Sequence, residues 1–191
     1  GGTARPAPPQ RGDFHAADMA RKYDVDETTL QNLVIENNTI DVLAEYRDST
    51  EMLAVKLKHL EYINDYRVDN GVGPLEFDMA VARLSNLHAY DQVYNDYMGL
   101  NSQDGSTPRD RAERYGIGIR AENIAMPGGV GTCEQLDGPA TLEYMHYSTD
   151  MFMAEGPGGG HHDNMLAPQH TGVGFGLQCY DGRVIYVEEF R

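Results

Sequence analysis

Up to residue 154, apolar side chains recur at the three- and four-residue spacing of helices that bury one face. This spacing predicts helices over residues 14–24, 26–37, 48–67, 79–98, 108–115 and 139–154. Asp26 and Asp78 stand where their carboxylates can cap the helices that follow, and Pro108 suits the first turn of its helix. We therefore expect the larger part of the chain to be helical.

The end of the chain follows a different pattern. From Thr171 apolar residues alternate with glycines, and Asp181-Gly182 separates this run from a second apolar run. An Asp-Gly pair between two such runs is typical of a tight β-hairpin. Residues 117–137 are expected to form an extended run and then a glycine-rich loop. Helices first and strands last predict the α+β class.

Composition divides the chain into three parts. Residues 1–12 are rich in proline and small side chains, which predicts a disordered leader. Residues 13–52 are expected to form a helical N-terminal extension, and residues 53–191 the main domain. The length of 191 residues suits one domain of ordinary size with an extra segment.

The charge narrows the range of partners. The formal net charge is −15, whereas binding to nucleic acid needs clustered Lys and Arg. The same charge opposes adsorption to anionic membranes. The chain contains no run of 18 apolar residues, so no transmembrane segment is expected. We predict a protein that binds no nucleic acid; the oligomeric state stays open.

Two cysteines, Cys133 and Cys179, are too few for a disulfide-rich scaffold. They form either one bridge or two buried thiols, and the sequence leaves both alternatives open. A bridge requires that their Cα atoms lie within about 7 Å of each other.

Two short stretches carry the candidate chemistry. Residues 155–166 run from Glu155 through three consecutive glycines to His161 and His162, and residues 122–125 read Glu-Asn-Ile-Ala. Three glycines suggest a shaped loop, and histidine can bind metal or titrate near neutral pH. We expect the two stretches to meet in one polar site. The alternatives are a flexible surface loop, and side chains at Glu122 and Asn123 that only satisfy backbone groups.

The chain resembles the superfamily of cysteine-rich secretory proteins, antigen 5 and pathogenesis-related 1 proteins (CAP), above all its bacterial SCP-like members. The resemblance covers residues 53–191 and rests on an ordered set of strings. These strings are Ile63-Asn-Asp-Tyr-Arg67, Pro74-Leu-Glu-Phe-Asp78, His88-Ala-Tyr-Asp91, Asp104-Gly-Ser106, Arg111-Ala-Glu-Arg-Tyr-Gly116, Glu122-Asn-Ile-Ala125, Gly160-His-His-Asp-Asn-Met-Leu166, Gly172-Val-Gly-Phe-Gly176 and Tyr186-Val-Glu-Glu-Phe190.

The resemblance implies an α-β-α sandwich, in which helices cover both faces of a small antiparallel sheet. It implies a secreted or cell-envelope location. It also implies a central cleft with two His and two Glu, a set that often holds a divalent cation.

Carried over by position, three residues match this set: Glu122, His161 and Glu155. The tryptophan that animal and plant members have three residues before the second Glu is Phe152 here. Leu100 stands at the position of the first family His, which is a departure. His88 belongs to another family position, about 18 Å along the helix from residue 100, and is expected to be a hydrogen-bonded scaffold residue.

Glu122, Glu155 and His161 are therefore the candidate metal ligands and the candidate catalytic residues. One imidazole and two carboxylates suit Mg²⁺ or Ca²⁺ better than Zn²⁺, so any cation is expected to bind weakly. His162, next to His161, is expected to point away from the site. A bound divalent cation (Zn²⁺, Mg²⁺ or Ca²⁺) stays a prediction.

Three functions are compatible with these residues. The first is an extracellular ligand-binding or interaction module, whose polar cleft takes a small molecule, lipid, glycan or peptide. The second is a metal-assisted hydrolase, a peptidase or glycosidase, in which the two carboxylates act as general acid and base. The third is a structural domain with a vestigial cleft. We favour the first, because the sequence contains no complete catalytic set.

Overall fold

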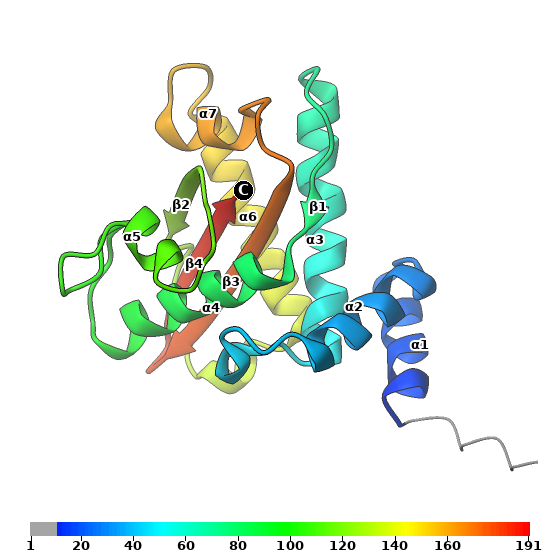
Figure 1. The fold of residues 1–191 in the computed structure, drawn as a ribbon. Coiled ribbons are helices and arrows are strands. Elements are labelled where there is room, and N and C mark those ends of the chain that lie inside the picture. Colours follow the sequence, from blue (N-terminus) through cyan, green and yellow to red (C-terminus); the bar gives the residue numbers. More distant parts are fainter. Residues whose placement is uncertain (1–10) are drawn as a thin grey trace, which may run out of the picture.

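A computed structural model describes residues 11–191, with side chains from His15 onward. The predicted leader, residues 1–12, therefore lies almost entirely outside the described residues. Figure 1 shows a small twisted sheet with helices on both sides. None of the helices in the described part of the chain is long and apolar enough to cross a membrane.

Four strands form one sheet in the order β1-β3-β4-β2. Their bounds are Glu76–Phe77 for β1, Ala121–Ala125 for β2, Gly172–Tyr180 for β3 and Arg183–Phe190 for β4. The two long strands form the predicted hairpin, with Asp181 and Gly182 both at positive φ in its turn. The pairs β3–β4 and β4–β2 are antiparallel, whereas the two-residue β1 adds in parallel to β3.

Seven α-helices accompany the sheet in the described residues. Their bounds are Arg11–Tyr23 (α1), Glu27–Thr39 (α2), Thr50–Asp69 (α3), Met79–Tyr94 (α4), Pro108–Glu113 (α5), Gly138–Ala154 (α6) and Gly160–Leu166 (α7). Short 3₁₀ turns lie at Ala44–Tyr46 (η1) and Cys133–Gln135 (η2). Asp26 and Asp78 cap α2 and α4, as their positions predict. The α+β class is confirmed.

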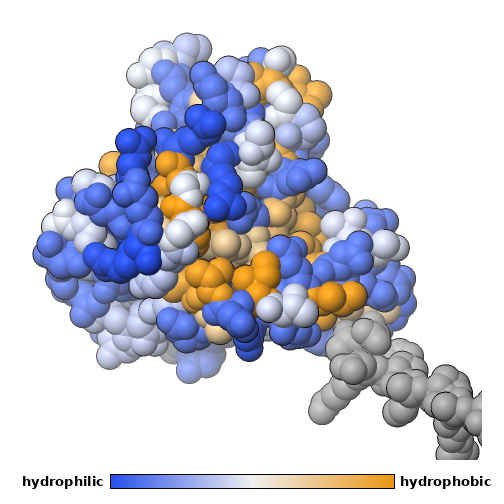
Figure 2. Space-filling model, viewed as in Figure 1, coloured by the Kyte–Doolittle hydropathy of each residue, from blue (hydrophilic) through white to orange (hydrophobic). Residues whose placement is uncertain are grey.

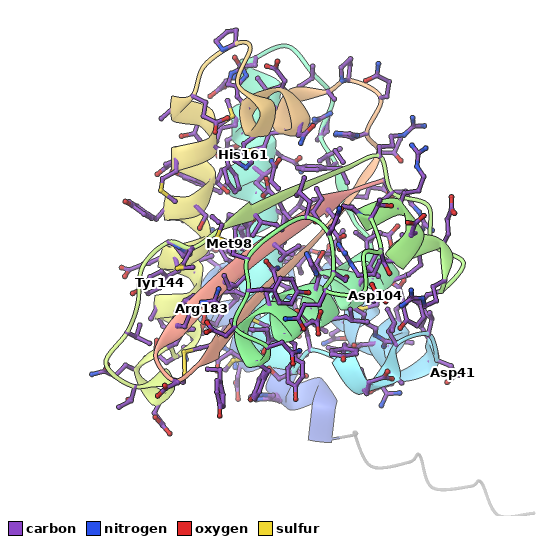
Figure 3. All side chains as sticks on the ribbon, turned by 90° about the vertical axis from the view of Figure 1, so that its left-hand side faces the viewer. Asp41, Met98, Asp104, Tyr144, His161 and Arg183 are labelled. Carbon is purple, nitrogen blue, oxygen red and sulfur yellow. A yellow bond between two sulfur atoms is a disulfide. The ribbon has the colours of Figure 1, made fainter. Side chains whose placement is uncertain are left out.

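The helices form two layers around the sheet. Helix α4 packs on one face, against β3 and β4, and α3 and α6 pack together on the other. Figure 3 views these layers from the side: His161 lies with α6 and α7, and Asp104 lies on the opposite side of the strands, before α5. The molecule is thus an α-β-α sandwich.

Strand β3 shows how its sequence creates these two faces. Val173, Phe175 and Leu177 belong to the core between the sheet and α3. Gly174 and Gly176 alternate with them and face α4. A Cβ atom on Gly174 would lie 2.6 Å from the Cα atom of the α4 residue Ala82, so only glycine lets the helix approach the strand this closely.

The N-terminal helices share the core of the main domain. Ala20 of α1 and Leu30 of α2 are buried in the same cluster as residues of α3. Arg83 of α4 is also buried, and its guanidinium donates to the backbone carbonyls of Asn37 and Ile40. The predicted boundary between residues 52 and 53 stays a prediction, although side-chain contacts cross it.

Two predicted elements differ from the structure. The fourth helix ends at Tyr94 instead of residue 98, because Asp96 takes a positive φ of 54° soon after the C-cap. The glycine-histidine stretch was expected to be a loop, and this was wrong from Gly160 onward, where α7 begins. The Glu155 carboxylate accepts hydrogen bonds from the backbone N–H groups of His161 and His162 and so stabilises the start of this helix.

The structure also decides between the two alternatives for the cysteines. Cys133 of η2 and Cys179 of β3 form a disulfide, and their Cα atoms are 5.7 Å apart. The bond attaches the glycine-rich loop after β2 to the end of the hairpin.

Candidate functional site

The two stretches singled out in the sequence meet at the edge of the sheet. Asn123 on β2 donates a hydrogen bond to the backbone carbonyl of His161 at 3.1 Å, and Asn164 on α7 donates to the Asn123 side-chain oxygen at 2.9 Å. Asn123 is fully buried. Its amide therefore attaches α7 to the sheet and satisfies backbone and side-chain groups of both elements.

The residues Glu155 and His161 form a pair on the α6–α7 side of this junction. The Glu155 carboxylate lies 2.6 Å from Nδ1 of His161, and this hydrogen bond holds the pKa of Glu155 below its usual value. Phe152, which is expected to stand in place of the family tryptophan, stacks on the His161 ring at a centroid distance of 4.6 Å. His162 turns away and contacts Asp163 at 2.9 Å.

The Glu122 carboxylate has quite different partners. It points to the face covered by α4 and α5, where it accepts a hydrogen bond from Arg111 at 2.6 Å. The residue directly opposite on β4 is a second buried acid, Glu189, which lies 3.7 Å from the same guanidinium and accepts from Ser85. Like charges at opposite positions on neighbouring strands destabilise a sheet, and Arg111 offsets that repulsion.

Burial and the nearby Glu189 raise the pKa of Glu122 well above its usual value. One guanidinium thus faces two carboxyl groups in a site that water hardly reaches. Within the described residues, four buried polar atoms of this cluster have no hydrogen-bond partner: Oε1 of Glu122, Oε2 of Glu189, Nε of Arg111 and Nδ1 of His88. The cluster is therefore incompletely satisfied.

His88 is buried on α4, and its Nε2 atom bonds the backbone carbonyl of Gly99 at 2.8 Å, as expected for a scaffold histidine. Its Nε2 atom is also 3.6 Å from Glu122, but burial lowers the pKa of His88 to about 4. The ring is consequently neutral at neutral pH, and the short distance is no ion pair. Leu100, the residue expected at the first family histidine position, is half exposed.

The opposite face of the same strands holds a second buried cluster. Glu188 accepts hydrogen bonds from Asn123 at 2.9 Å and from the Tyr186 hydroxyl at 2.7 Å. His59 on α3 contacts that hydroxyl at 2.9 Å. Neither Glu188 nor His59 was among the candidate residues predicted from the sequence. Two consecutive acids inside an apolar strand were the available signal, because one of them had to face the core.

The three candidate metal ligands therefore lie in two different environments. Glu155 and His161 pair with each other, whereas the Glu122 carboxylate binds Arg111. Residues 15–191 contain no group of three or more His, Cys, Asp or Glu side chains that could share a metal ion. The arginine at Glu122 would compete with any cation, so metal binding stays a prediction that this geometry does not favour.

A cavity of about 440 Å³ opens beside this junction, between α5, β2 and α7. Its lining contains Leu100, Ile119, Arg109, Arg120 and Asn164, together with Thr107, Pro108, Ala121 and Glu122. Its size is that of small-molecule sites in other proteins. Figure 2 shows a strip of hydrophobic atoms with hydrophilic borders over the region of α5 and β2.

Comparisons with known proteins bear on the fold and the family. The chain is similar in structure to an outer surface protein of Borrelia burgdorferi, at 15% identity and a TM-score of 0.53, covering 75% of this chain and 93% of that one. It is also similar to BmVAL-1, at 16% identity and a TM-score of 0.51, covering 71% of this chain and 75% of that one. These likenesses support the fold.

A third similar structure is an extracellular protein containing a SCP domain from Bacillus anthracis, at 26% identity and a TM-score of 0.45. The match covers 72% of this chain and 42% of that protein. No curated protein matches the chain. The model of the cysteine-rich secretory protein family matches residues 60–190, which is well over half of the chain. The chain belongs to this family, the CAP family.

Proposed function

We propose that this protein is an extracellular ligand-binding module, and that the cavity between α5, β2 and α7 takes an amphipathic ligand with an anionic head group. The observation that carries the proposal is the pair of arginines, Arg109 and Arg120, beside the apolar side chains of Leu100 and Ile119. Neither guanidinium forms an ion pair or a hydrogen bond within the described residues.

The charge of the whole chain makes this pair unusual. Acidic residues outnumber Lys and Arg by 30 to 15, yet two arginines line one small cavity. Guanidinium groups bind carboxylates and phosphates through two parallel N–H donors. The amide of Asn164 and the hydroxyl of Thr107 add hydrogen-bonding groups to the lining. An apolar tail against Leu100 and Ile119, with its anionic head at the arginines, matches this distribution.

Two observations support a location outside the cytoplasm. The disulfide between Cys133 and Cys179 is of the kind that persists in oxidising compartments. The family to which the chain belongs is named for secretory proteins.

The test compares probes that differ only in charge. Octanoate, octyl phosphate and the neutral octanamide are titrated into the protein by calorimetry at low and high salt. We expect saturable binding of at least one anion, binding of octanamide at least tenfold weaker, and a loss of affinity as salt increases. The ratio of octanoate to octyl phosphate affinity tells carboxylate from phosphate recognition.

The variant Arg109→Gln/Arg120→Gln tests the site itself. It should weaken binding of the anion at least tenfold and leave octanamide unaffected. Arg114→Gln is the matched control, because Arg114 is exposed and bonds Ser106 outside the cavity lining. Equal affinity for anion and amide, or unchanged affinity in the double variant, would contradict the proposal.

A further inference from the structure

A continuous row of hydrogen bonds crosses the core on the α3–α6 side of the sheet. Nδ1 of His146 lies 2.9 Å from Nδ1 of His59, whose Nε2 lies 2.9 Å from the Tyr186 hydroxyl. That hydroxyl donates to Oε2 of Glu188 at 2.7 Å. His59, Tyr186 and Glu188 have no exposed surface, while His146 is partly exposed. The row thus leads from the surface to a fully buried carboxyl group.

The number of protons on each side chain decides which group donates and which accepts in each hydrogen bond of this row. A tyrosine hydroxyl has one proton, and Tyr186 gives it to Glu188, so Nε2 of His59 donates to the tyrosine oxygen at 2.9 Å, with the Thr149 hydroxyl as a more distant second partner at 3.2 Å. A neutral imidazole has a proton on one nitrogen only, so Nδ1 of His59 accepts from the Nδ1–H of His146. Burial lowers the pKa of both histidines, which keeps both rings neutral at neutral pH.

We propose that His146, His59, Tyr186 and Glu188 form a reversible proton relay, which carries a proton between the surface and the buried Glu188. In the uptake step a solvent proton binds Nε2 of His146, whose Nδ1 proton moves to Nδ1 of His59. The Nε2 proton of His59 moves to the Tyr186 oxygen, and the proton of that hydroxyl moves to Oε2 of Glu188. Three bonds to hydrogen break and four form, so one proton is taken up and neither ring is left charged.

The surface end of the relay is built for this exchange. No hydrogen bond in the described residues uses Nε2 of His146, and this atom is not among the buried atoms without a partner, so it faces solvent. The ring of Tyr62 stacks on His146 at a centroid distance of 3.9 Å, and the Tyr62 hydroxyl donates to Asp150 at 2.5 Å. The stacked ring keeps Nδ1 of His146 directed at His59.

The buried end of the relay reaches the candidate binding site. Oε1 of Glu188 accepts from Asn123, which also donates to the His161 carbonyl and thereby holds α7. A hydrogen bond to an ionised carboxylate is stronger than one to a neutral carboxyl group. Protonation of Glu188 therefore weakens the attachment of α7, whose Asn164 lines the cavity. This consequence for ligand binding rests on the proposed function, but the relay itself does not.

Few other titratable groups face Glu188. His161 approaches from α7, where Glu155 pairs with it, and Asp150 lies beyond the far end of the relay. Glu189, the next residue, points to the opposite face of the sheet. Burial raises the pKa of Glu188 to about 7, although Tyr186, Asn123 and His161 act in the opposite direction. Proton uptake is therefore expected close to neutral pH.

The test is nuclear magnetic resonance of the histidine side-chain nitrogens in the ligand-free protein, from pH 5 to pH 8.5. We expect His59 to carry its proton on Nε2 at high pH and on Nδ1 at low pH. His146 should change from Nδ1 to Nε2 over the same range, and both changes should share one midpoint near pH 7. A common midpoint for two rings is the signature of a coupled relay, which a merely structural role would not produce.

Two variants distinguish proton transfer along the row from a purely structural role of its buried side chains. In Glu188→Gln the new amide donates to Tyr186, so both rings should stay in the low-pH arrangement at every pH. In Tyr186→Phe the row is interrupted, so no coupled change should occur. Glu189→Gln is the matched control: the same substitution, on the same strand but the opposite face, should leave the change intact.

The proposal is overturned if His59 and His146 keep the same protonated nitrogens across the range, or if Glu188→Gln still shows the coupled change. Because no ligand is added, this result does not depend on whether the cavity binds an anion. If octanoate does not bind but the coupled change is present, only the proposed function is contradicted.

Discussion

The two faces of the sheet handle their buried acids in opposite ways. On the α4 side, Glu122 and Glu189 share one guanidinium, and each keeps one oxygen without a partner in the described residues. On the α3–α6 side, both oxygens of Glu188 accept a hydrogen bond, from Asn123 and from Tyr186. One cluster depends on charge compensation, and the other depends on a complete set of hydrogen bonds.

Neighbouring residues of one strand can therefore have unrelated roles. Glu188 and Glu189 are adjacent in β4, and Glu122 and Asn123 are adjacent in β2. The two-residue period of a strand sends the members of each pair to opposite faces. A short sequence string read as a unit, such as the Glu-Asn pair, therefore contributes to two separate clusters.

Removal of the guanidinium that Glu122 and Glu189 share should destabilise the protein most. Arg111→Met leaves two buried carboxyl groups without compensation and should lower the free energy of unfolding by about 3–5 kcal/mol at pH 7, measured by urea denaturation. The loss should shrink as the pH falls, because the raised pKa of Glu122 favours protonation of that carboxyl group. Arg109→Met, a control on the exposed side of the same helix, should change stability by no more than about 0.5 kcal/mol.

The stability that the Glu188 cluster contributes should depend on pH. The pKa of Glu188 is raised from 4.5 to about 7, so its contribution to stability is complete below pH 4.5 and is lost as the pH rises through 7. The stability of the native protein relative to Glu188→Gln should therefore fall by roughly 3 kcal/mol between these limits. Denaturation of both proteins at several pH values measures this; a pH-independent difference would contradict the assigned environment.

A disturbance of the packing between α4 and the sheet should have a smaller effect on stability. Gly174→Ala places a Cβ atom 2.6 Å from the Cα atom of Ala82, and we expect a loss of about 1–3 kcal/mol as α4 is displaced. Gly118→Ala is the control, because a Cβ atom there meets nothing within 4 Å. Thermal unfolding of both variants distinguishes steric overlap from a general effect of replacing glycine.

The smallest effect concerns the start of α7. Glu155→Ala removes the acceptor of two backbone N–H groups and should cost about 1 kcal/mol, the usual worth of a helix cap. Hydrogen exchange should rise at the amides of His161 and His162. Faster exchange throughout the domain, instead of at α7 alone, would show that this carboxylate does more than cap the helix.

Much of the fold was predictable from local patterns. The apolar periodicity of α3, the capping acids Asp26 and Asp78, and the Asp181-Gly182 turn act within a few residues, and the structure confirms each of them. The start of α7 was not predictable, because a glycine-rich run opposes a helix locally. Its N–H groups are satisfied by Glu155, which lies outside the helix at the end of α6.

The candidate site, like the fold, was predictable from the sequence only in part. The sequence alone pointed to the Glu122 stretch and the His161 stretch as the polar candidates, and its acidic charge predicts that the protein binds no nucleic acid. Tertiary packing is what brings Asn123 between the two stretches and turns Glu122 to Arg111. It also assembled His59, Tyr186 and Glu188 from distant parts of the chain. These placements could not be predicted locally, because side-chain direction follows strand register, and register depends on a partner strand far along the chain.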